Sequence, residues 1–110
     1  MKIYYELPKV STNQYYTGMH WSQRNKIAKK YHNDIYYLCK KNNLPKVKES
    51  CKIIFGFATK FDLDNNSIII KMIIDSLRYG GIIKDDNKKY VKGIEIKIAD
   101  ENYFEIIESD

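Results

Sequence analysis

Hydrophobic and polar residues alternate in four segments of the chain. A period of two, with Ile, Val, Tyr and Phe at alternate positions, is typical of strands that bury one face. It predicts strands over residues 1–7, 50–60, 90–98 and 103–107. Residues 100–102 form a turn, so we expect the last two strands to pair as a hairpin. Gly56 interrupts the second strand and is interpreted as a β-bulge.

Two further segments have the spacing of helices. The first helix is predicted from His20 to Lys41 or Asn42, with Ser22 able to cap its start. The second runs from about Asn66 to Tyr79 and ends at two glycines. Residues 11–18 are expected to be a loop. The order β-α-β-α-β-β predicts one α/β (α+β) domain over residues 1–110, with a small mixed β-sheet and two main helices.

The second predicted helix is apolar almost all round. Its apolar residues are Ile68, Ile69, Ile70, Met72, Ile73, Ile74 and Leu77. Such a helix is buried on most sides, in the core or against a second subunit. Because a chain of this length has few other elements to cover it, we expect an outward face at Ile70 and Ile74 to form a homodimer interface.

Composition narrows the class of protein. With 110 residues, 44% of them hydrophobic, the chain has one core and is not disordered. No apolar run approaches the roughly 20 residues of a membrane span, and the first residues lack the order of a secretory signal. We therefore expect a soluble cytoplasmic protein. Cys39 and Cys51 do not have the spacing of a zinc clip and are interpreted as reduced structural thiols.

The net charge of +5 is unevenly distributed along the chain. Residues 20–50 contain eight Lys and Arg but only two acids, whereas residues 100–110 contain five acids and no base. Clustered cations bind polyanions by releasing counterions from phosphates. The first helix is therefore a candidate DNA-binding element, although a solvated polar face is an equal alternative. Its candidate residues are His20, Arg24, Lys26, Lys29 and Lys30.

Acidic residues flank the second helix. Asp62 and Asp64 share a face if their segment is extended, and Asp85 and Asp86 follow the helix. If residues 82–84 run back along the helix, these carboxylates meet. Carboxylates that share a small volume stay ionised together only with a hard cation, so we predict a Mg²⁺ site, with Mn²⁺ as a substitute.

Lys71 and Asp75 lie on the one polar stripe of the same helix. A lysine beside such a metal site can hold a phosphate and stabilise its developing charge. The alternative is structural: Lys71 and Asp75 form an ordinary salt bridge, and Asp62 and Asp64 cap the helix.

At these positions the sequence resembles the RusA-type crossover junction endodeoxyribonucleases, a family of small phage-derived resolvases. The resemblance covers most of the chain. Its N-terminal part is Asn13, Tyr15-Tyr16, Gly18, His20-Trp21, Arg24 and Lys26. Its second part is Asp62-Leu63-Asp64-Asn65, Lys71, Asp75-Ser76-Leu77, Gly81-Ile82, Asp85-Asp86 and Tyr90-Val91. One spacing departs from the family: six residues separate Asn65 from Lys71, where the best-known members have three.

The resemblance implies a homodimer that resolves four-way (Holliday) DNA junctions in recombination and repair, by paired Mg²⁺-dependent hydrolysis of two strands. It implies catalytic roles for Asp62, Asp64, Lys71 and Asp86, with the three aspartates as metal ligands and Asp75 and Asp85 as further acids. It also implies a phage or prophage protein in a bacterial host, with no small-molecule cofactor. Two other interpretations stay open: a catalytically silent DNA-binding or phage regulatory protein, and a structural or protein-binding domain.

Overall fold

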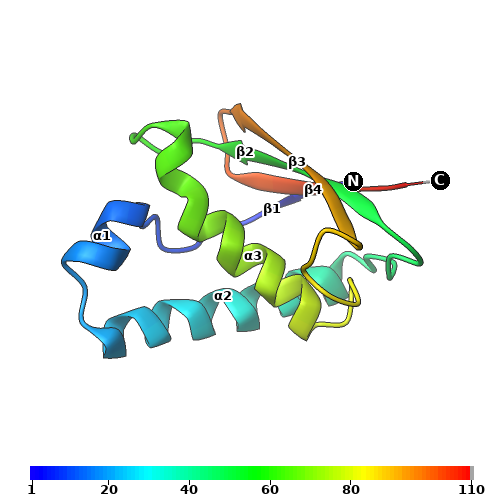
Figure 1. The fold of residues 1–110 in the computed structure, drawn as a ribbon, viewed down its shortest axis with the longest axis horizontal. Helices are drawn as coiled ribbons and strands as arrows, with labels where there is room; N and C mark the ends of the chain where they lie inside the picture. Colours follow the sequence, from blue (N-terminus) through cyan, green and yellow to red (C-terminus); the bar gives the residue numbers. More distant parts are fainter. Residues whose placement is uncertain (110) are drawn as a thin grey trace.

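Four strands form one mixed sheet in the computed structural model, which describes residues 1–109 (Figure 1). They are β1 (Lys2–Tyr4), β2 (Cys51–Phe57), β3 (Val91–Ile98) and β4 (Tyr103–Glu108). Their order in the sheet is β1-β4-β2-β3. Strand β4 is antiparallel to β1 and β2, whereas β2 and β3 are parallel. The expected mixed sheet is confirmed, and Asp110 lies outside the described residues.

The helices are α1 (Thr12–Thr17), α2 (Trp21–Lys41) and α3 (Ser67–Tyr79), and a 3-10 turn, η1 (Leu63–Asn66), precedes α3. The two main helices and the α+β class are as predicted. Residues 11–18, expected to be a loop, instead contain α1. Ser11 caps this helix: its hydroxyl accepts from the Gln14 N–H at 3.1 Å, and the Gln14 side chain accepts from the Ser11 N–H at 3.0 Å. This reciprocal Ser-x-x-Gln capping box was readable from the sequence.

The predicted hairpin of the last two strands is wrong. Strand β4 lies between β1 and β2, so β3 and β4 flank β2 and do not pair with each other. Residues 99–102 cross the end of β2, where the Ala58 N–H donates to the Asn102 side-chain oxygen at 2.8 Å and the Ala99 N–H donates to the Phe57 carbonyl at 2.9 Å. The short connection is therefore bonded to the strand that it passes over.

Gly56 is not a bulge, because its register with Lys97 and Tyr103 is regular. The irregularity in β2 lies instead between Cys51 and Lys52. Gly56 is required for a different reason: the Tyr103 ring lies against its Cα, and any Cβ there would overlap the ring.

We expect Gly56→Ala to lower the free energy of unfolding by about 1–3 kcal/mol, because the added methyl group forces the Tyr103 ring out of its place. Urea denaturation measures the change. Gly93→Ala is the matched control: it lies in the neighbouring strand, and its Cβ would make ordinary contact with the Lys52 side chain at 3.5 Å. Equal stabilities of the two variants would contradict the role given to Tyr103.

Helix α3 is covered on both sides within a single chain. It packs against α2, and its isoleucines face the sheet residues Ile53, Phe55 and Phe57, which are buried with it in one core. Ile70 and Ile74 are each only 8% exposed. The expected outward apolar face at these two residues is therefore wrong, because both side chains are already buried within the single chain.

Both cysteine thiols lie in the interior of the protein. Cys39 and Cys51 are free and buried, and burial raises the pKa of the Cys39 thiol to about 11. The thiol is thus protonated and unreactive at neutral pH. Among the described residues, no helix is long and apolar enough to cross a membrane.

Candidate functional site at the helical junction

Helix α1 is hydrogen-bonded to η1 and to the start of α3. The Thr12 hydroxyl donates to the Asn65 carbonyl at 3.2 Å and lies 2.8 Å from the Ser67 hydroxyl oxygen. The Asn13 N–H donates to the Asn65 side-chain oxygen at 3.2 Å. These bonds bring together residues more than 50 positions apart in the sequence. Asn13 and Asn65 therefore belong to one surface.

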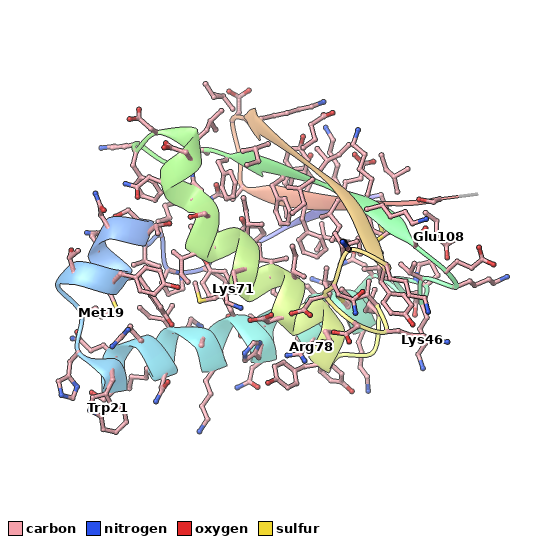
Figure 2. The ribbon with its side chains drawn as sticks, in the orientation of Figure 1. Met19, Trp21, Lys46, Lys71, Arg78 and Glu108 are labelled. Atoms are coloured by element: carbon pink, nitrogen blue, oxygen red, sulfur yellow. The ribbon has the colours of Figure 1, made fainter. Side chains whose placement is uncertain are left out.

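Lys71 lies along the middle of α3 (Figure 2) and its side chain is 62% exposed. Its amino group lies 3.3 Å from a carboxylate oxygen of Asp75, which is mostly buried. Tyr15, from α1, is close to both Lys71 and Arg24. Burial raises the pKa of its hydroxyl, while the charges of Arg24 and Lys71 act in the opposite direction. The Arg24 guanidinium lies 5.8 Å from the centre of the Tyr15 ring.

These contacts define what we call the helical junction surface, where α1, α2, η1 and α3 meet. Its members are Asn13, Tyr15, Arg24, Asn65, Lys71 and Asp75. The surface combines two cations, of which Lys71 is paired with the Asp75 carboxylate, with amide and hydroxyl groups. Such cations, amides and hydroxyls are groups that bind phosphate oxygens.

His32 extends this surface toward the C-terminal end of α3 and was not assigned from the sequence. Its Nδ1 lies 2.8 Å from the Ser76 hydroxyl, and its ring centre is 4.9 Å from that of Tyr79. Burial lowers the pKa of His32, the Asp75 charge raises it and the Arg78 charge lowers it. His32 is therefore mainly neutral at pH 7 and joins α2 to α3. The periodicity of one helix does not reveal which residue of another helix it contacts.

Asp62 and Asp64 are exposed at the N-terminal end of α3. Asp62 precedes η1 and Asp64 lies inside it, so their segment is a 3-10 turn and not the extended chain that would place both carboxylates on one face. The Asp62 side chain makes no capping hydrogen bond. Its carboxylate is thus not explained as a helix cap.

Asn66 holds this acidic turn in place and was not singled out in the sequence. It is fully buried, and its amide group donates to the carbonyls of Asp62 and Leu63 at 3.3 and 3.2 Å. The Thr59 hydroxyl donates to its side-chain oxygen at 3.0 Å. One buried amide therefore fixes the backbone that carries Asp62 and Asp64.

Asp85 and Asp86 lie at the opposite end of α3. Residues 82–84 do not run back along the helix: the Ile82 N–H donates to the Leu77 carbonyl at 2.9 Å, and the Val47 N–H donates to the Ile82 carbonyl at 2.8 Å. The 13 residues of α3, about 20 Å in length, separate the two acidic pairs. Within residues 1–109, no group of three or more His, Cys, Asp or Glu side chains could hold a metal ion. A single chain therefore does not fit the three-carboxylate Mg²⁺ site.

The basic residues of α2 divide between two faces. Arg24 is partly buried and, seven residues before the fully buried Tyr31, faces the helical junction surface. Lys26 and Lys29 are exposed on the other side, and Lys30 forms an ion pair with Asp34 at 3.0 Å. His20 caps the helix, because its Nδ1 accepts from the Ser22 N–H at 3.2 Å; Ser22 is not the cap.

The site thus consists of a helical junction surface with one acidic turn beside it and a second acidic pair a helix length away. Trp21 adds an exposed ring at the start of α2, at the outer corner of the molecule (Figure 2). The chain matches no family model, no curated protein and no solved structure.

Proposed function

We propose that the chain is a divalent-cation-dependent endodeoxyribonuclease of the RusA type, which cuts four-way DNA junctions as a homodimer. One observation carries the proposal. Folding joins the two distant segments that bear the family resemblance, with Asn13, Tyr15 and Arg24 from one and Asn65 and Lys71 from the other. Segments that act on one substrate must meet in this way, whereas unrelated surface residues need not.

The exposed Lys71 is the group best placed to hold a phosphate. It projects from a helix in which most residues are buried, and its partner Asp75 limits the directions in which its amino group can point. Arg24 adds a second cation that is held against Tyr15. Together they supply contacts to the DNA backbone that do not depend on sequence. Lys26 and Lys29, on the other side of α2, would contact a different arm of a branched molecule.

Mg²⁺ or Mn²⁺ is proposed at Asp62, Asp64 and Asp86, with Asp75 and Asp85 as further acids. Because the first two and the third lie at opposite ends of α3, the proposal requires that Asp86 come from a second copy of the chain. A twofold axis would then create two equivalent sites. Two sites match the two symmetry-related strands that a junction presents.

A catalytically silent DNA-binding protein is the second candidate. The observation that favours it is that one chain, over residues 1–109, brings no three ligand side chains together. The helical junction surface would then bind DNA without cutting it.

The two functions are separated by incubating the protein with a synthetic four-way junction and a linear duplex, in Mg²⁺ or in EDTA. We expect paired nicks in the junction only, and only with Mg²⁺. Salt-sensitive binding without nicks would favour the silent DNA-binding protein. Neither binding nor nicks would contradict both candidates and leave a structural or protein-binding domain.

A further inference from the structure

Strand β3 is a long, open edge of the sheet. The other edge, β1, has three residues, whereas β3 has eight. The Ala99 N–H donates to the Phe57 carbonyl, and in a parallel ladder every second residue faces the neighbouring strand. The backbone groups of Ile94, Ile96 and Ile98 therefore point away from β2, with no strand beside them in residues 1–109.

The same three isoleucines leave an apolar stripe uncovered along this edge. They lie opposite Ile53, Phe55 and Phe57, on the side of the sheet that faces the helices. Those partners are at most 2% exposed, but Ile94, Ile96 and Ile98 are 48, 37 and 81% exposed. Free backbone groups next to exposed isoleucines are the features that favour strand addition.

The sequence of β3 is complementary to itself in one antiparallel register. When two copies are centred on Ile96, Ile94 lies opposite the partner's Ile98 and Glu95 lies opposite the partner's Lys97. A centre at Glu95 would instead oppose two glutamates, and a centre at Lys97 two lysines. The charges thus favour the register centred on Ile96, in which the isoleucines also lie opposite each other.

We propose that two copies of this chain pair along β3 in this register, about a twofold axis through Ile96 perpendicular to the sheet. The four-stranded sheets then form one continuous sheet. In an antiparallel pair, the backbone groups of Ile96 and the partner's Ile96 exchange two hydrogen bonds, and each Ile94 does so with the partner's Ile98. Glu95, already 3.1 Å from Lys52 and 3.0 Å from Lys97 of its own chain, gains a third cation.

This pairing would also help to assemble the proposed nuclease site. The biological role of the dimer rests on that proposed function. Strand β3 ends beside β2, from which the chain continues to Asp62. An antiparallel partner begins its own β3 at that same end, so the partner's Asp85 and Asp86 lie toward Asp62 and Asp64. The dimer thus places the partner's Asp85 and Asp86 on the side of Asp62 and Asp64 where a metal site shared by two chains requires them.

Sedimentation equilibrium of the whole chain, without DNA or metal, tests the interface. We expect a dimer for the native chain and a dissociation constant raised on the order of 100-fold for Ile96→Asp, which places two carboxylates at the twofold axis. Ile107→Asp is the matched control: Ile107 is 44% exposed but lies on β4, where it pairs with Lys52 of β2, on the other side of the sheet. A native monomer, or an Ile96→Asp variant as dimeric as the control, would overturn the proposal.

Charge reversal tests the register independently of folding. Glu95→Lys opposes lysines across the axis and Lys97→Glu opposes glutamates, so we expect each variant to dimerise about tenfold more weakly or worse. An equimolar mixture should restore the dimer as a heterodimer, since the altered residues then face opposite charges. Failure of the mixture to associate better than either variant would contradict the register. A dimer that passes these tests but does not cut DNA would leave the interface standing and refute only the nuclease.

Discussion

Two inactive variants of this protein should regain activity when they are mixed. Asp64→Asn and Asp86→Asn are each expected to slow junction cutting on the order of 100-fold or more, because each removes a proposed metal ligand from both sites of the dimer. In a heterodimer of the two, one site carries both substitutions and the other carries neither. Random mixing makes half of the dimers heterodimers, so about a quarter of the native sites should be intact.

The measurement is nicking of a labelled junction after the two variants are unfolded together and refolded. Single nicks are expected, since each heterodimer has one intact site. A mixture that stays as inactive as its components would show that Asp64 and Asp86 do not form a site across two chains. The control is a mixture of Asp62→Asn with Asp64→Asn, which must remain inactive because both residues belong to the same end of α3.

Replacing Lys71 by Met should separate activity from stability. Cutting is expected to fall on the order of 100-fold, because the cation that holds the phosphate is lost while the length of the side chain is kept. The free energy of unfolding should change by less than about 1 kcal/mol, since the Lys71–Asp75 ion pair is largely exposed on the lysine side. Junction cutting and urea denaturation measure the two effects.

Lys71→Arg keeps the positive charge and should retain a measurable part of the activity. Lys40→Met is the control: Lys40 is also an exposed helical lysine, but it lies at the C-terminal end of α2, with its amino group 5.0 Å from the centre of the Tyr36 ring. It should leave the rate of cutting unchanged within about a factor of two. If Lys71→Met cuts as well as this control, Lys71 is only the partner of Asp75 in a surface ion pair.

The elements were predictable from local patterns, because each depends on residues close in the sequence. Helix α2 matched its 3.6-residue period, and Gly81, with a φ of 75°, ends α3 as its position predicted. Helix α1 was missed although its capping box was visible in the sequence. Its six residues are too few to show a helical repeat of apolar positions.

The arrangement of the elements was less predictable, because it depends on contacts between distant segments. Turn residues at 100–102 favour a hairpin of β3 and β4. In the sheet, however, β4 lies between β1 and β2, and β3 pairs with the other side of β2. The pattern of apolar residues in α3 showed how much of the helix is buried, but not whether its own chain or a second chain buries Ile70 and Ile74.

The candidate site divides in the same way. The sequence singled out Asn13, Arg24 and Lys71 by their motifs, and the structure brings their segments together at the helical junction surface. The path of residues 82–84 could not be predicted, since it depends on the bonds of Ile82 and Ile83 to Leu77 and of Ile82 to Val47. That path decides where Asp85 and Asp86 lie.

The pairing of β1 with β4 affects when the domain can close during synthesis on the ribosome. Lys2–Tyr4 bonds to a strand that spans residues 103–108, and the Tyr5 N–H donates to the Asn102 carbonyl. The first strand therefore has no partner until residues 103–105 have left the exit tunnel. Up to that moment its apolar face, with Ile3, is open to chaperones and to neighbouring nascent chains.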